Sequence, residues 1–202
     1  MNGFERRREL KKGQILKAAA QLFLENGLEK TTVQEIAAKA NVSYAVIFKY
    51  FISKDNLINE VMRWLYEQKY KQLESIVRSN SSFLERCNRM FLQNTKVFDI
   101  DPDIINKASS YDSDIIHATS SQYEARSKKL YYEFFEEGKQ EGYIHPDVSI
   151  DAILLHRDAF RSLISMKPEL FNEFKYDRQL FKDYMRVLWF GIMQRMGELD
   201  EH

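Results

Sequence analysis

Side chains suited to binding rather than to bond-making cluster in one short stretch near the N-terminus. They combine hydroxyl groups, ammonium groups and one small apolar side chain, and they are Thr32, Ser43, Tyr44, Ala45, Lys49, Tyr50 and Lys54. Hydroxyl and ammonium groups bind phosphate oxygens and base edges, and an alanine methyl can contact the methyl group of thymine. Because no nucleophile with an adjacent base accompanies them, the pattern favours binding of nucleic acid over catalysis.

The residues around this cluster predict two short helices joined by a tight turn. Thr32 and Glu35 form a capping box at the start of the first helix, which ends near Asn41, a residue that tolerates left-handed backbone geometry. The second helix is expected over residues 44–50, with Ser43 as its N-cap. A helix-turn-helix of this kind places the start of its second helix in the major groove of DNA.

The start of the second helix carries the residues that are expected to read bases. Ala45 can contact a thymine methyl, and Ser43 and Tyr44 offer hydroxyl groups to bases or phosphate. Thr32 stands where backbone amides and the helix dipole attract a phosphate. Tyr44 could instead be a half-buried packing residue, so both interpretations are open at this point.

Basic and aromatic residues beyond these positions are expected to contact the phosphate backbone. Lys49, Tyr50 and Lys54 follow the base-reading positions, although Tyr50 could be a packing residue and the lysines could be solvated. Residues 6–12 form a basic arm that could add phosphate or minor-groove contacts, or could be disordered. Residues 1–54 hold ten Lys and Arg against five Asp and Glu, whereas the whole chain has a formal net charge of zero. A basic head on an acidic body suggests that only the head meets a polyanion.

Helical periodicity extends over nearly the whole chain and must position this cluster. Besides the two short helices, we expect a first helix that ends at Asn26-Gly27 and further helices over about 53–78 and 82–98. Another should begin at Asp101-Pro102, followed by one over about 114–140. The last two should run from residue 147 or 149 to before Pro168 and over about 176–196. Only three prolines and seven glycines interrupt 202 residues. The prediction is an all-α fold of about nine helices. Residues 1–55 form a three-helix helix-turn-helix domain, and residues 56–202 form a helical effector-binding and dimerisation domain.

Several classes of protein are disfavoured by composition. The chain has a single cysteine, Cys87, which allows no intrachain disulfide and favours a cytoplasmic setting. We expect Cys87 to be a small buried residue rather than a redox sensor. No apolar run approaches the roughly 20 residues that span a bilayer, so no membrane association is expected. The four histidines and Cys87 show no paired metal-ligand spacing. We therefore expect no metal, no cofactor and no enzymatic activity.

Residues from about Gln14 to Leu57 resemble the DNA-binding domain of the TetR family of bacterial regulators. The resemblance is carried by many positions at fixed spacing: Ile15-Leu16-Lys17-Ala18-Ala19 with Phe23 and Gly27, Thr31-Thr32-Val33 with Ile36-Ala37, Val42-Ser43, Ile47-Phe48, Tyr50-Phe51, and Ser53-Lys54-Asp55 with Leu57. It implies a symmetric dimer whose divergent C-terminal domain pairs the subunits and holds a small-molecule inducer. Asn41 replaces the usual glycine of the turn, Phe48 replaces a usual phosphate-binding tyrosine, and Ala45 stands where glycine or proline is common.

Large apolar side chains in the C-terminal part suggest an effector cavity between helices. The candidate lining residues are Met62, Tyr66, Phe91, Phe98, His117 and Tyr123, with His117 as a polar anchor or merely a surface residue. Aromatic residues at helical spacing are also typical of an ordinary core, so that alternative is open.

The last two predicted helices are expected to pair subunits across a two-fold axis. The candidate residues are Phe160, Leu163 and Ile164 on one helix and Tyr184, Leu188, Gly191 and Ile192 on the other. A glycine in mid-helix suggests a close helix crossing, either between subunits or within one chain.

Together these observations predict a homodimeric transcriptional regulator. We expect a repressor that binds a palindromic operator in double-stranded DNA and is released by a small apolar effector. An alternative is a DNA-tethered adaptor whose C-terminal body binds a protein partner instead.

Overall fold

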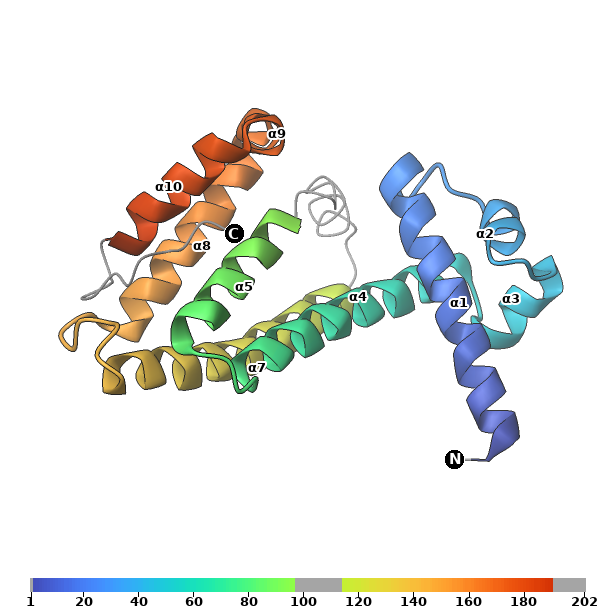
Figure 1. The fold of residues 1–202 in the computed structure, drawn as a ribbon. Helices are drawn as coiled ribbons and strands as arrows, with labels where there is room; N and C mark the ends of the chain where they lie inside the picture. Colours follow the sequence, from blue (N-terminus) through green and yellow to red (C-terminus); the bar gives the residue numbers. More distant parts are fainter. Residues whose placement is uncertain (1, 97–113, 191–202) are drawn as a thin grey trace. The chain divides into compact units, whose positions relative to one another are not determined.

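The computed structural model describes residues 2–96 and 114–190, and every regular element in these ranges is an α-helix (Figure 1). The elements are α1 (Gly3–Asn26), α2 (Val33–Lys39), α3 (Tyr44–Tyr50), α4 (Lys54–Val77), α5 (Phe83–Lys96), α7 (Asp114–Gln140), α8 (Ile150–Met166), α9 (Pro168–Tyr176) and α10 (Arg178–Phe190). The predicted all-α fold is confirmed. The helix expected from Asp101-Pro102 lies outside the described residues.

Three predicted helix starts carry side-chain caps. The Thr32 hydroxyl accepts from the Glu35 amide at 3.2 Å, and the Glu35 carboxylate accepts from the Thr32 amide at 2.7 Å. Ser82 forms the equivalent box at the start of α5. The Ser149 hydroxyl accepts from the amide of Ala152 at 3.1 Å at the start of α8. These caps satisfy amides that the helix itself leaves unpaired.

Helix α1 begins three turns before the apolar pattern and includes the segment that we expected to be an arm. Asn2 is its N-cap, and the Asn2 side chain and the Glu5 carboxylate form a reciprocal capping box. Helix α1 ends at Asn26 and is capped by Gly27, whose φ of 85° suits a glycine. Residues 6–12 are therefore helical, and the Asn2–Glu5 spacing is the sequence signal that would have shown it.

The C-terminal helices differ from the prediction at one place. Pro168, which we took as a stop, is the first residue of the additional helix α9 (Pro168–Tyr176). Proline is well suited to a first helical position, because the amide it lacks would have no partner there. Helix α10 then starts at Arg178, where the Asp177 carboxylate accepts from the Leu180 amide at 2.9 Å.

The described residues divide into two units, each with its own contacts. The first unit comprises residues up to Tyr70 with Asp114–Glu124, and the second comprises residues from Lys71 and from Ala125 onward. In the first unit, apolar residues of α1, α2, α3 and the start of α4 form one core cluster. None of the described helices is long and apolar enough to cross a membrane. The boundary at residue 55 stays a prediction.

Aromatic stacking organises the core of the second unit. The ring of Phe83, at the start of α5, lies 4.7 Å from that of Phe134 and 5.1 Å from that of Tyr143. Beside them Arg86 is buried, and its guanidinium donates to the carboxylate of Glu137 and, at 2.9 Å, to the carbonyl of Val77. A buried guanidinium thus joins α5 and α7 to the last residue of α4.

Candidate nucleic-acid interface

The turn between α2 and α3 sets the direction of α3. Asn41 has a φ of 50°, the left-handed geometry for which asparagine is better suited than most residues. The turn is closed by the amide of Val42, which donates to the carbonyl of Ala37 at 3.0 Å. Ala37, Ile47 and Phe51 are buried, so the opposite side of α3 is turned away from the core. The sequence interpretation of this motif as a helix-turn-helix agrees with this geometry.

The outward side of α3 presents an aromatic pair. Tyr44 is 48% exposed and Phe48 42% exposed, and their ring centroids lie 4.9 Å apart at 59°. Ala45 is exposed beside them, and Ser43 is exposed and makes no side-chain capping bond to α3. Tyr44 therefore lies at the surface of α3 and outside the core cluster of the head. Its pairing with Phe48 was not expected, although the i, i+4 spacing could have indicated it.

Thr32 is exposed at the start of α2, but its groups are engaged within the chain. Its amide and its hydroxyl both bond to the Glu35 carboxylate, at 2.7 Å and 2.8 Å. The hydrogen bonds from the backbone and then the side chain of Thr32 lower the pKa of Glu35. A phosphate contact by the Thr32 amide would therefore require the Glu35 side chain to move.

The remaining predicted DNA contacts differ in exposure. Lys49 is exposed, whereas Tyr50 is half-buried with its ring 6.3 Å from that of Phe51. Lys54 is also half-buried, and its ammonium group donates to the carbonyl of Glu29 at 3.1 Å. Lys54 thus ties the start of α4 to the loop after α1, a structural role that sequence reasoning missed.

Thr31 supports this motif from beneath. Its side chain is buried, and its hydroxyl lies 3.1 Å from the carbonyl of Leu22 and 2.8 Å from that of Gly27. Thr31 directly precedes the N-cap of α2, so its hydroxyl links the start of α2 to the end of α1. The sequence placed Thr31 only within the family pattern and assigned it no role.

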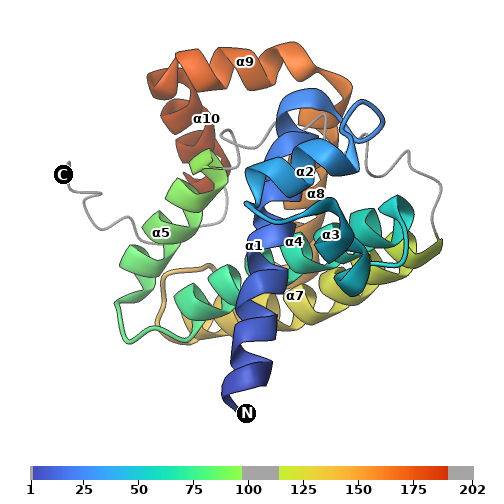
Figure 2. The ribbon, with the colours of Figure 1, turned by 90° about the vertical axis from the view of Figure 1, so that its right-hand side faces the viewer.

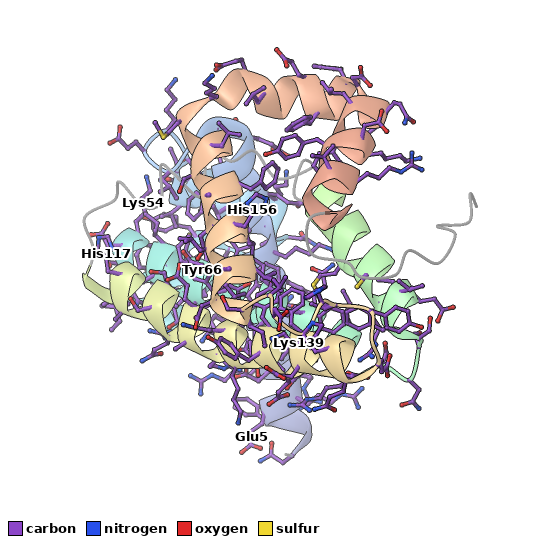
Figure 3. The ribbon with its side chains drawn as sticks, turned by 90° about the vertical axis from the view of Figure 1, so that its left-hand side faces the viewer. Glu5, Lys54, Tyr66, His117, Lys139 and His156 are labelled. Atoms are coloured by element: carbon purple, nitrogen blue, oxygen red, sulfur yellow. The ribbon has the colours of Figure 1, made fainter. Side chains whose placement is uncertain are left out.

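The structure brings two of the predicted effector residues into contact. Tyr66 and Tyr123 are in contact, with ring centroids 5.2 Å apart. Met62 is buried in the core cluster of the first unit, and His117 is exposed near the start of α7 (Figure 3). The side chain of Phe91 and all of Phe98 lie outside the described residues. The pocket as a whole stays a prediction.

The predicted dimer residues are placed partly inside the protomer. The ring of Phe160 lies 5.3 Å from that of Tyr184 and 6.3 Å from that of Phe174, so these rings pack between α8, α9 and α10. Leu163 is half-buried. The side chains of Ile164 and Leu188, and residues Gly191 and Ile192, lie outside the described residues. Among the described side chains of α8 and α10, the large apolar ones that stay exposed are instead Leu155, Met166, Leu180 and Val187.

Cys87 is buried on α5, and burial raises the pKa of its thiol to about 12. A thiol with such a pKa holds little thiolate at neutral pH and is a poor nucleophile. In the part of the chain that the structure describes, no cluster of three His, Cys, Asp or Glu residues could hold a metal ion.

A three-helix head that presents the exposed start of α3 defines a helix-turn-helix DNA-binding protein. Residues 15–61 match the family model described as "Bacterial regulatory proteins, tetR family". The N-terminal part of the chain is thus similar to the DNA-binding domain of the TetR family, and the chain is a DNA-binding transcriptional regulator rather than an enzyme.

Individual relatives agree with this assignment. The chain is 27% identical, over 153 residues, to the HTH-type transcriptional repressor KstR2 of Mycobacterium tuberculosis, covering 71% of this chain and 74% of the relative. It is 26% identical, over 204 residues, to the probable HTH-type transcriptional regulator YttP of Bacillus subtilis, covering 93% of this chain and 96% of the relative.

Solved structures share the fold. The ketosteroid transcriptional regulator KstR2 of Mycobacterium tuberculosis matches with a TM-score of 0.61 at 21% identity, over 91% of this chain and 95% of that one. Reduced NemR of E. coli matches with a TM-score of 0.69 at 15% identity, over 88% of this chain and 97% of that one.

Proposed function

We propose that the protein is a homodimeric repressor that binds a near-palindromic operator and is released from it by a small apolar molecule. The observation that carries the proposal is the exposed start of α3, with Tyr44, Ala45 and Phe48 on the helix that follows the turn at Asn41. In this proposal residues 1–55 are the DNA-binding head and residues 56–202 the effector and dimer body. The protein would act in the cytoplasm, where the bacterial chromosome lies.

Repression is inferred from the relatives. The curated relative KstR2 is named a transcriptional repressor, and the simplest shared mechanism is occupation of an operator. Two heads related by a two-fold axis would present two α3 helices to half-sites about 34 Å apart, or a multiple of that distance. A near-palindromic sequence is therefore expected.

The dimer surface that we propose is the exposed apolar face of α8 and α10. Leu155 and Met166 are eleven residues apart, and Leu180 and Val187 are seven apart, so each pair lies on one face of its helix. Large apolar side chains at the surface carry a cost in water that a second copy of the chain would remove. Leu155→Glu combined with Val187→Glu should shift the protein from dimer to monomer in analytical ultracentrifugation.

The effector site is proposed around Tyr66 and Tyr123, whose rings contact each other. An apolar ligand that binds one arrangement of the heads better than another would change operator affinity, with a coupling typically of ~1–3 kcal/mol. Titration of an operator complex with a panel of apolar metabolites tests this. Tyr66→Ala should weaken the response without changing DNA affinity in the absence of effector.

The test of DNA binding is selection of duplexes from fragmented host DNA, followed by titration of the enriched site at several salt concentrations. Lys49→Ala should weaken binding to all sequences alike. It should also reduce the slope of log K against log salt by about 1, the amount expected for one lost phosphate contact. Tyr44→Ala should instead change base preference. The control is Lys129→Ala, because Lys129 is exposed on α7 and lies outside the helix-turn-helix. Weak, sequence-blind binding by the wild type would refute the proposal.

A further inference from the structure

The first turns of α1 form a helical extension that the core of the head does not cover. Residues 2–10 are all exposed, including the apolar side chains of Phe4 and Leu10, whereas burial on α1 begins at Ile15. Figures 1 and 2 show these turns projecting past α2 and α3. We call residues 3–12 the α1 extension.

Local bonds hold the α1 extension in its helical form. The Asn2 side chain accepts from the amides of Phe4 and Glu5 at 3.1 Å and 2.9 Å, and the Glu5 carboxylate accepts from the Asn2 amide at 2.9 Å. At its other end the ammonium group of Lys12 lies 2.7 Å from the Glu60 carboxylate on α4. The extension is therefore capped at one end and tied to the head at the other. Figure 3 places Glu5 at its tip.

The α1 extension carries an excess of positive charge that its neighbours leave unneutralised. Arg6, Arg7, Arg8 and Lys11 are exposed or half-buried, and none of them has an ion-pair partner among the described residues. Of the two acidic residues in the same turns, Glu5 is engaged in the cap. Four cations on a capped helix of a DNA-binding head would be strongly attracted to phosphates.

We propose that the α1 extension binds the phosphate backbone beside the site of α3 and does not enter the minor groove. An α-helix with its side chains is about 10–12 Å across, whereas the minor groove of B-DNA is only about 6 Å wide. An extended arm could enter the groove and read A·T against G·C, but a helix cannot. The contact therefore adds affinity and salt dependence without adding base preference. This inference rests on the proposed binding of operator DNA by α3.

The test uses the full chain with Arg6→Gln, Arg7→Gln and Arg8→Gln together, since glutamine preserves helix propensity. Each phosphate contact contributes about 0.9 to the slope of log K against log salt, so the slope should fall by about 2–3. Affinity at low salt should fall on the order of 10- to 100-fold, while base preference stays the same. An unchanged slope would overturn the proposal and leave Phe4 and Leu10 as candidates for a protein contact.

A matched control removes the same charge elsewhere. Lys129, Lys167 and Lys182 are exposed on or beside α7, α8 and α10, and their replacement by glutamine should leave the slope within experimental error of wild type. An equal loss of slope in this control would also overturn the proposal, because net charge alone would then explain the effect.

Two further measurements separate a helix from an arm. Exchanging A·T for G·C pairs on either side of the operator core should leave affinity unchanged, and a marked loss would point to minor-groove reading and refute the inference. Glu9→Pro breaks the helix within the extension and should lower affinity as the arginine variant does. Wild-type affinity in Glu9→Pro would show that helicity is unnecessary. Failure of the proposed function is distinguishable, because the wild type would then bind no specific site.

Discussion

Replacing Gly138 with alanine is expected to destabilise the protein, although alanine is the better helix former. Gly138 lies in α7 close to its end at Gln140. A Cβ at this position would lie 2.6 Å from Cε2 of Phe83, closer still to Cζ of the same ring, and 3.0 Å from Cδ1 of Ile144. The absence of a side chain at this position is what allows α5 to pack so closely.

The magnitude follows from how little room the Phe83 ring has. The ring is buried and stacked on Phe134 at 4.7 Å and on Tyr143 at 5.1 Å, so a shift away from a new methyl group would disturb both contacts. Overpacking a filled core typically costs about 1–3 kcal/mol. Against this, alanine gains about 1 kcal/mol of helix propensity over glycine. With the cost near its upper end, Gly138→Ala should lower the free energy of unfolding by about 2 kcal/mol.

Urea unfolding followed by circular dichroism measures this change, at one fixed protein concentration because the stability of the proposed dimer depends on it. Gly13→Ala is the matched control: Gly13 also lies in a helix, but a Cβ there would meet no atom within 4 Å. That variant should gain about 0.5–1 kcal/mol. A Gly138→Ala protein as stable as the wild type, or more stable, would refute the packing argument.

Three other perturbations have equally definite expected outcomes. Thr31→Val removes the buried hydroxyl that bonds to the carbonyl oxygens of Leu22 and Gly27. Urea titration should show a loss of about 1–2 kcal/mol in the free energy of unfolding, and unchanged stability would contradict this. Burial raises the pKa of the Cys87 thiol to about 12, so iodoacetamide at pH 8 should modify the unfolded chain and not the native protein, and rapid native labelling would count against it. Arg86→Met removes the hydrogen-bond donor to Glu137 and Val77. It should lower the free energy of unfolding by about 2–4 kcal/mol, which is somewhat less than breaking a fully buried ion pair costs, because the Glu137 carboxylate is partly exposed. The hydrogen bond from Arg86 lowers the pKa of Glu137 in the folded state. The stabilisation that depends on this ionisation is therefore present above the unfolded pKa of about 4.3 and is lost as the pH falls through the folded value. Urea titrations between pH 3 and pH 7 should show the difference between wild type and Arg86→Met shrinking in acid, and a constant difference would refute this.

Local chemistry explains why so much of the head could be predicted. The Thr32–Glu35 box and the left-handed Asn41 each depend on residues only a few positions apart, and such interactions can be recognised from spacing alone. The Asn2–Glu5 box obeys the same rule. That spacing is equally visible in the sequence and indicates a helical α1 extension.

Other features depended on which element covers a given face, and periodicity does not contain that information. An apolar stripe at helical spacing shows that one side of a helix avoids water, but the partner comes from elsewhere in the chain. Phe160 and Tyr184 were assigned to a dimer contact, and in the fold their rings pack with that of Phe174 from the unpredicted helix α9. Tyr44 and Phe48 are just as aromatic, yet both stay exposed, because the turn at Asn41 directs the other side of α3 to the core. The sequence by itself determined most of the helices and several of their caps, since those are local, whereas burial is a property of the assembled fold and was decided only by the tertiary structure.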